Sequence, residues 1–242
     1  MELIVVKNYE EMSKKAASII SSQVIIEPNS VLGLATGDTP LGMYKELIKK
    51  YKENEVDFSK VKTFNLDEYY GLERDNIQSY YFYMINNFFE FINIDSNNIN
   101  IPNGTSNDIE EDCLNYERKI KEAGGIDIQV LGIGVNGHIG FNEPNVNFEA
   151  QTHLVNLNEN TIKSNARFFN SIDEVPKKAI SMGIKTILQS KKIILLASGE
   201  SKAEAVYNTV KGKISPEIPS SILQLHQNVT IILDESAAKL LQ

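Results

Sequence analysis

The sequence predicts an α/β protein, a single domain over residues 1–242 with a doubly wound, mostly parallel sheet and helices on both faces. Short runs rich in Val, Ile and Leu alternate with segments of helical periodicity along the chain. The runs are continuously apolar, which is typical of strands that are buried on both faces. With 242 residues, 42% of them hydrophobic, the chain can bury one sizeable core.

The first half of the chain supplies three strand and helix units. The run "ELIVV" at 2–6 predicts a strand, and 10–26 predicts the helix after it. The run "VLGLA" at 31–35 predicts a second strand, followed by a helix over 40–52 whose apolar residues share one face. The run "VKTFNL" at 61–66 predicts a third strand, and a long aromatic-rich helix is expected from Asn76.

The second half repeats the pattern. Apolar residues of 108–125 follow helical spacing and include the only cysteine, Cys113, so we expect a packed thiol and no disulfide framework. Strands are predicted in "IDIQVLGIG" at 126–134, "KIILLAS" at 192–198 and the start of "NVTIILDESAAKLL" at 228–241, with a helix over 199–212. Ligands of such sheets bind at the carboxyl ends of the strands, so the loops after these runs are the expected site.

Charge and composition exclude several classes of partner. The net charge of −8 argues against nucleic acid or an anionic membrane surface, because both require a dense basic patch. No apolar run reaches the roughly 18 residues of a membrane span, and the N-terminus turns acidic too early for a signal peptide, so we expect a soluble, cytoplasmic protein. No Cys/His cluster or carboxylate pattern has metal-ligand spacing, and we expect neither metal nor cofactor.

The loop "TGDTPLG" after the second strand has the character of an anion site. Thr36 and Thr39 offer hydroxyls, Gly37 permits tight backbone geometry, and the N–H groups of the following helix point at an incoming charge. Asp38 is an acidic residue inside this turn. An ordinary strand-to-helix turn is the alternative interpretation, and the spacing is not that of a P-loop.

The loop "DEYYGL" after the third strand places Asp67 beside Glu68. Adjacent carboxylates repel and project differently, so one can enter a site as a base while the other faces away or holds the loop. An acidic pair at this position can also be a helix cap or a solvated loop.

The stretch "GIGVNGHIGFNEP" at 132–144 combines four glycines with a histidine and a glutamate. The glycines let the backbone approach a ligand, His138 can move protons near neutral pH, and Glu143 can orient or polarise the imidazole. The spacing G-x-G-x-x-G also imitates a dinucleotide fingerprint, but that fingerprint usually belongs to a first strand–helix–strand unit, and this one lies in the middle of the chain.

Two cations complete the candidate anion pocket. Lys202 is expected in the first turn of a helix, where the helix dipole disfavours a cation unless an anion neutralises it. Arg167, in "SNARFF", could clamp the same anion through its fork of donors. Either residue alone could instead be a solvated surface charge.

These motifs together resemble the glucosamine-6-phosphate deaminase (isomerase) family, and the resemblance covers most of the chain. It extends over "VLGLATGDTPLGMY", "TFNLDEYYGL", "SYYFYM", "LGIGVNGHIGFNEP", "SNARFF" and "ILQLH". It implies conversion of glucosamine 6-phosphate and water into fructose 6-phosphate and ammonia without a cofactor. By position, Asp67 matches the base that moves a proton between C2 and C1, and His138 matches the group that opens the sugar ring, with Asn136 and Glu143 as its partners.

The same resemblance implies that the 36–39 turn, Arg167 and Lys202 hold the substrate's phosphate. Many members carry Asp where this chain has Asn136, and Asp38 must point away from the phosphate or weaken its binding. In allosteric members a basic pair holds the phosphate of the activator N-acetylglucosamine 6-phosphate, and the matching positions here are His153 and Val155. We therefore expect no such activation.

Two other functions remain open at this stage. The 6-phosphogluconolactonases share the fold and a related glycine-histidine loop but hydrolyse an ester, and they continue differently after the histidine. A sugar-phosphate-sensing module of a transcription regulator would need a DNA-binding domain and a basic stripe. The sequence leaves the oligomeric state undetermined.

Overall fold

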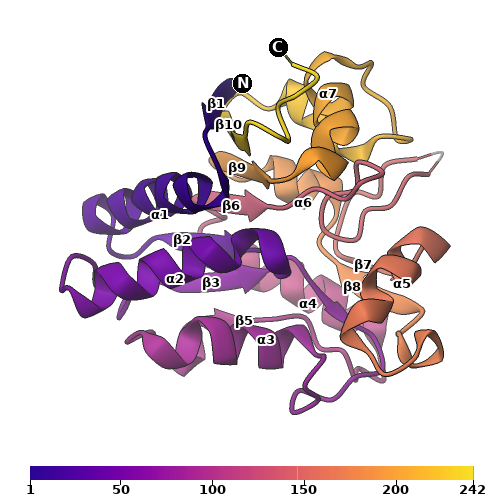
Figure 1. Ribbon diagram of the computed structural model, residues 1–242. Coiled ribbons are helices and arrows are strands. Elements are labelled where there is room, and N and C mark those ends of the chain that lie inside the picture. Colours follow the sequence, from indigo (N-terminus) through magenta and orange to yellow (C-terminus); the bar gives the residue numbers. More distant parts are fainter. Residues whose placement is uncertain (146, 242) are drawn as a thin grey trace.

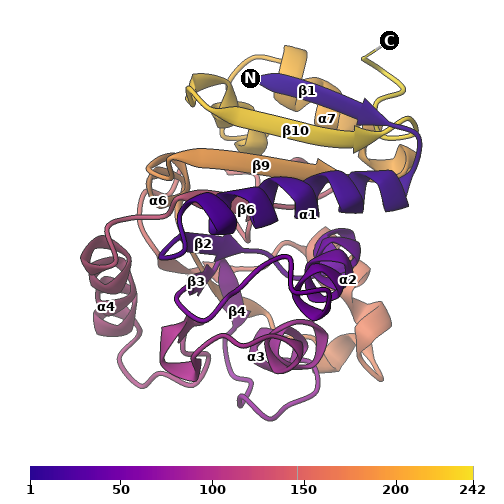
Figure 2. The same cartoon turned by 90° about the vertical axis from the view of Figure 1, so that its left-hand side faces the viewer.

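The computed structural model describes residues 1–145 and 147–241. A seven-stranded sheet lies at its centre in the order β1-β10-β9-β6-β2-β3-β5, with every neighbouring pair parallel. The strands are β1 (Glu2–Val6), β2 (Val31–Leu34), β3 (Lys62–Asn65), β5 (Ile99–Asn100), β6 (Ile128–Leu131), β9 (Lys192–Ala197) and β10 (Val229–Asp234). Figure 2 shows these strands stacked from β1 down to β3.

Helices cover both faces of this sheet, which confirms the doubly wound arrangement expected from the sequence. One face packs against α1 (Tyr9–Ile26), α2 (Asp38–Lys52) and α3 (Tyr80–Asn87). The other face packs against α4 (Ile109–Glu122), α6 (Ile184–Leu188) and α7 (Ala203–Lys211). Figures 1 and 2 show α1 and α2 together on one side of the strands, with α7 on the other.

The strand order reverses between β2 and β6. From β2 the chain winds outward through β3 to β5, and from β6 it winds the other way through β9 to β10. A crevice forms at such a switch point outside the carboxyl ends of the strands, and ligands of open α/β sheets bind there. The turn after β2 and the glycine-rich loop after β6 therefore face each other across the reversal.

A second, three-stranded antiparallel sheet was not predicted. It consists of β4 (Asp67–Tyr69), β8 (Lys178–Ser181) and β7 (His153–Asn156), in the order β4-β8-β7. Its strands have three or four residues, which is too few for a periodicity signal. Because β4 begins two residues after β3 ends, this sheet extends the wall of the crevice beyond the main sheet.

The prediction of a long helix from Asn76 is wrong in both the start and the length of the helix. Helix α3 begins at Tyr80 and has eight residues, followed by a short 3₁₀ helix over Phe89–Phe91. The Asn76 side chain accepts the backbone N–H of Gln78 (2.8 Å), and Ser79 caps the helix by accepting from Phe82 (3.0 Å). Local side-chain bonds of this kind compete with helix formation and delay its first turn.

Cys113 is buried and free, as expected. No helix in the described part of the chain is long and apolar enough to cross a membrane.

Candidate active site

A cavity of about 450 Å³ opens at the carboxyl ends of β2, β3 and β6. It gathers nine of the ten residues selected from the sequence: Thr36, Gly37, Asp38, Thr39, Asp67, Asn136, His138, Arg167 and Lys202. Glu143 is the exception, because it lies behind His138 and does not line the cavity. The loops chosen by their positions after apolar strands thus meet in one place.

The turn after β2 ends in an open helix terminus. Gly37 has a φ of 94°, a conformation that favours glycine, and it precedes α2, which begins at Asp38. No side chain of the described residues caps this terminus. The first N–H groups of an α-helix have no intrahelical partner, so the start of α2 offers donors and a positive dipole end to an anion in the cavity.

Tyrosine hydroxyls bind the carbonyl groups of this turn. Tyr44 donates to Ala35 (2.6 Å), Tyr83 donates to Gly37 (2.6 Å), and Tyr9 donates to Asp38 (2.8 Å). The three tyrosines come from α2, α3 and α1, so the turn is fixed by three helices. With its carbonyl oxygens occupied, the turn presents fewer acceptor groups that would repel an anion.

Arg167 and Lys202 both line the cavity. The Nη2 of Arg167 lies 2.6 Å from Oδ2 of Asp38, and both side chains are exposed. Burial, and next the positive charge of Arg167, lower the pKa of Lys202 below its ordinary value. The sequence left open whether Asp38 points away from the anion pocket, and in the structure it does not. It lines the cavity and neutralises one of the two cations.

Asp67 and Glu68 have separate environments, as expected for adjacent carboxylates on a strand. Asp67 lines the cavity but is only 6% exposed; burial, and next the charge of Glu68, raise its pKa to about 8. Glu68 turns away and accepts the backbone N–H groups of Tyr69, Tyr80 and Tyr81, each at 2.8 Å. Burial raises the pKa of Glu68 to about 6, against the opposing effect of these hydrogen bonds. Asp67 is thus the carboxylate available to a ligand.

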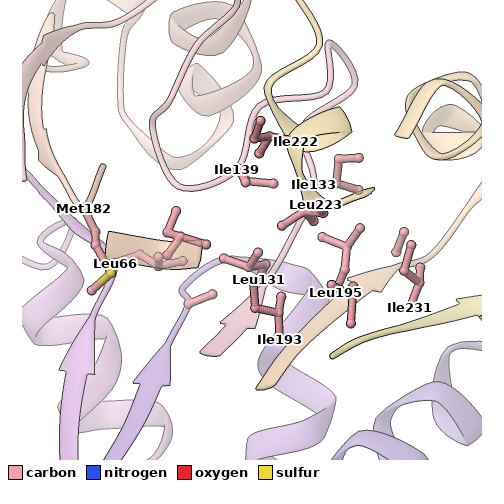
Figure 3. Close-up of a cluster of buried hydrophobic side chains, with 14 of the residues drawn as sticks. Leu66, Leu131, Ile133, Ile139, Met182, Ile193, Leu195, Ile222, Leu223 and Ile231 are labelled. Carbon is pink, nitrogen blue, oxygen red and sulfur yellow. The ribbon is translucent and has the colours of Figure 1, made fainter. Parts of the chain in front are cut away.

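Two buried isoleucines anchor the glycine-rich loop after β6. Ile133 and Ile139 are 6% and 0% exposed and pack into the cluster of buried side chains drawn in Figure 3. Between them the His138 ring lies against the backbone of Gly134, where an added Cβ would be only 2.3 Å from the ring. At Gly140, with a φ of 58°, the corresponding Cβ position is 3.5 Å from Oδ2 of Asp67. The loop therefore brings the histidine and the carboxylate to the same cavity.

The His138 ring is backed by Glu143. Nδ1 of the ring lies 3.5 Å from Oε2 of Glu143, and the two side chains are 21% and 8% exposed. Glu143 also accepts from the amide of Asn136 (2.9 Å) and from the hydroxyl of Thr161. Burial acts to raise the pKa of Glu143, but the close contact with the His138 ring, and next the hydrogen bonds from Thr161 and Asn136, outweigh it and hold the pKa below its usual range.

Asn136 contacts both Glu143 and the backbone of His138. Its amide nitrogen bonds Glu143, and its oxygen accepts the backbone N–H of His138 (3.2 Å). It therefore supports the imidazole through Glu143 and the loop backbone, and not by a direct bond to the ring. The reason is geometric, since Gly137 alone separates Asn136 from His138 in a tight turn, while the Glu143 carboxylate lies near both side chains.

Several residues of the site carried no recognisable signal in the sequence. Thr161, from α5 (Glu159–Asn165), binds Glu143 across 18 residues of chain, and Asn165 donates to the hydroxyl of Tyr69 (2.8 Å). The tyrosines Tyr9 and Tyr83 meet the anion turn only because α1 and α3 pack beside it. Such contacts depend on tertiary structure and have no fixed spacing. Among the described residues, no group of three or more His, Cys, Asp or Glu could hold a metal ion.

The fold and the cavity together define an α/β protein with a pocket for an anionic ligand beside a buried carboxylate and a histidine. The family described as glucosamine-6-phosphate isomerases/6-phosphogluconolactonase matches residues 7–232. The chain therefore belongs to this family.

The relatives with the higher sequence identities to this chain are glucosamine-6-phosphate deaminases. A glucosamine-6-phosphate deaminase of Clostridium botulinum (strain Langeland) is 68% identical over 100% of this chain and 99% of its own length. One of Clostridium acetobutylicum is 66% identical over the full length of both. A solved structure of a monomeric glucosamine-6-phosphate deaminase is similar with a TM-score of 0.97 and 50% identity, covering 99% of this chain and 100% of that one. The 6-phosphogluconolactonase of Thermotoga maritima, at 18% identity and a TM-score of 0.74, shares the fold.

Proposed function

We propose that the protein is a glucosamine-6-phosphate deaminase, which converts glucosamine 6-phosphate and water into fructose 6-phosphate and ammonia in amino-sugar breakdown. The names of relatives that are 66–68% identical over the whole chain support the reaction. The structural observation that carries the proposal is the meeting of Asp67, His138 and an anion pocket in one cavity.

The anion pocket would hold the phosphate. The N–H groups at the start of α2, the hydroxyls of Thr36 and Thr39, and the cations Arg167 and Lys202 would bind it, because all of these residues line the cavity. A phosphate carries nearly two negative charges at neutral pH, and Lys202, Arg167 and the positive dipole end of α2 can attract it although Asp38 cancels one positive charge. The net charge of the chain is no obstacle, because these cations are local.

His138 would open the sugar ring. Ring opening requires one group to take the proton of the C1 hydroxyl and return a proton to the ring oxygen, which an imidazole can do near neutral pH. The Glu143 carboxylate lies 3.5 Å from Nδ1 and orients the ring for this transfer. Asn136 and Thr161 donate hydrogen bonds to Glu143 and hold it beside Nδ1. The other ring nitrogen, Nε2, is then available to the sugar.

Asp67 would then take the proton from C2 while the aldehyde oxygen at C1 gains a proton, and would deliver its own proton to C1. The amino nitrogen loses a proton as C2 becomes an imine, and water adds to this carbon and displaces ammonia. A carboxylate that is buried is a stronger base than one in water, and a pKa of about 8 is close to the operating pH, as efficient proton transfer requires. Among the described residues, Asp67 is the carboxylate that is both buried and in the cavity wall beside the loop of His138.

Release of ammonia and fructose 6-phosphate from glucosamine 6-phosphate, with no metal added, tests the reaction. We expect Asp67→Asn to fold and to bind inorganic phosphate but to lose at least ~10²-fold in turnover, as for a lost general acid–base group. Asp57→Asn, on the exposed surface, is a matched control that should keep full activity. Near-normal turnover of Asp67→Asn would remove this residue from the mechanism, and hydrolysis of 6-phosphogluconolactone in place of deamination would favour the lactonase alternative.

A further inference from the structure

Helix α3 (Tyr80–Asn87) is bonded to two separate parts of the cavity wall. At its start, the carboxylate of Glu68 accepts the backbone N–H groups of Tyr80 and Tyr81. Within the same helix, the hydroxyl of Tyr83 donates to the carbonyl of Gly37 in the anion turn. One contact crosses 12 residues of chain and the other 46, so α3 is the element that connects the two.

The Glu68 contact fixes the start of α3 relative to the proposed base. Glu68 follows Asp67 directly in β4 and is only 3% exposed. A carboxylate is buried at low cost only when hydrogen bonds replace its water, and three backbone N–H groups do so here. A side chain held in this way has little freedom, so the first turn of α3 is tied to the strand that carries Asp67.

The Tyr83 contact fixes a donor of the anion turn. In a trans peptide the carbonyl of one residue and the N–H of the next point in opposite directions in one plane. When Tyr83 holds the carbonyl of Gly37, it also sets the direction of the N–H of Asp38, the first residue of α2. That N–H is one of the donors without an intrahelical partner that face an incoming phosphate.

We infer that α3 holds the anion turn at a set separation from Asp67, with Glu68 and Tyr83 as positioning residues at its two attachments. The inference rests on the proposed function, because the sugar between phosphate and C2 has a fixed length and both its ends must be placed at once. Proton abstraction requires the base within hydrogen-bonding reach of its proton, and a misplacement of about 1 Å can cost 10²-fold in rate.

The test measures the effect of each residue at the other attachment of α3. In Glu68→Gln, one acceptor oxygen becomes a donor that faces a backbone N–H, so the start of α3 shifts. We expect the affinity for inorganic phosphate, measured by calorimetry, to fall about 2- to 10-fold, although Glu68 does not face the anion turn. In Tyr83→Phe, which removes one oxygen from a half-buried ring, we expect kcat to fall by a similar factor along with a rise in KM.

Tyr81→Phe is the matched control. It lies on the same helix, and its hydroxyl makes no hydrogen bond within residues 1–145 and 147–241, so phosphate affinity and kcat should stay at wild-type values. A folded Glu68→Gln with unchanged phosphate affinity would overturn the inference, and so would a Tyr83→Phe that raises KM at constant kcat. If Glu68→Gln fails to fold, Tyr83→Phe decides alone. A wild-type protein that binds phosphate but releases no ammonia from glucosamine 6-phosphate would refute the proposed function, and the phosphate titration of Glu68→Gln would still test the helix.

Discussion

Asn136 donates its side-chain amide to Glu143, with 2.9 Å between Nδ2 and Oε2, and so acts on the carboxylate that backs His138. A neutral donor at this position stabilises the charged form of Glu143, and its bond is one cause of the lowered pKa of that residue. An aspartate, which many members of the family carry here, could accept hydrogen bonds but could not donate one when ionised.

Asn136→Asp should raise the pKa of Glu143. The change removes a hydrogen bond to the charged carboxylate and places a second negative charge beside it, and both effects favour the protonated form. We expect this rise to appear in a carbon-13 titration, with the signal assigned by its absence in Glu143→Gln. Asn136→Ala should give a smaller rise, because it removes the bond without adding a charge. A lower pKa in Asn136→Asp would contradict the donor role.

The raised pKa of Asp67 predicts a pH dependence of activity. A base must be deprotonated, so log(kcat/KM) should rise with a slope near one below pH 8 and level off above about 8. Glu68→Gln should move this limb to lower pH, since the charge of Glu68 is the second cause of the shift. A limb that stays in place in Glu68→Gln would show that another group controls it.

The same shift has a consequence for stability. The pKa of Asp67 is raised from 3.8 when unfolded to about 8 when folded, so its contribution to stability is fully present below about pH 4 and is lost as the pH rises through 8. Asp67→Asn should therefore have a melting temperature at least ~2 °C above that of the wild type at pH 9, with a smaller difference at pH 5. Equal differences at both pH values would mean that Asp67 is not buried as a neutral acid.

The parts of the site that the sequence predicted are those with a positional rule. The turn at 36–39, the acidic pair and the glycine-rich loop each follow an apolar strand directly, and parallel strands end at one edge of a sheet. The contacts of Thr161 with Glu143 and of Tyr83 with Gly37 were not predicted, because they join segments whose separation in sequence has no meaning before the chain folds. The small β4-β8-β7 sheet was not predicted for a related reason. Strands of three or four residues are stabilised mainly by pairing with their neighbours, which come from distant parts of the chain.

His138→Gln should separate ring opening from proton transfer. Glutamine retains a hydrogen-bonding side chain but cannot exchange a proton near neutral pH. We expect a larger loss of turnover on glucosamine 6-phosphate than on an analogue already in the open-chain form, by at least ~10-fold. Equal losses on the two substrates would assign His138 to a step after ring opening.

The ion pair between Arg167 and Asp38 predicts unequal roles for the two cations. Lys202 makes no ion pair within the described residues and is partly desolvated, so Lys202→Ala should weaken binding of inorganic phosphate by roughly 10- to 100-fold. Arg167→Ala should cost less, because the arginine must share its charge with Asp38. Asp38→Asn should strengthen phosphate binding, since it frees Arg167 and removes a negative charge. Calorimetric titration of the three variants checks this order, and weaker binding by Asp38→Asn would show that the aspartate positions Arg167 for the phosphate.

The surroundings of His153 and Val155 bear on regulation. Both residues lie in β7 and line a hollow of about 310 Å³, separate from the cavity of Asp67. The described residues that line this hollow include no lysine or arginine, but they include Glu143 and Glu149. Nδ1 of His153 already lies 2.9 Å from the carbonyl oxygen of Gln151. A phosphate placed here would meet carboxylates and no permanent cation.

We therefore expect N-acetylglucosamine 6-phosphate not to activate the enzyme. An activator shifts a conformational equilibrium only by its different affinities for the two states, and a hollow that repels a phosphate dianion offers little affinity in either. Saturation curves with glucosamine 6-phosphate should be hyperbolic and should superimpose with and without the second sugar phosphate. The double variant His153→Arg, Val155→Lys supplies the missing charges and is the matched test of binding: it should take up N-acetylglucosamine 6-phosphate more tightly than the wild type in calorimetry. A sigmoidal wild-type curve that becomes hyperbolic with the activator would show that other residues form a regulatory site.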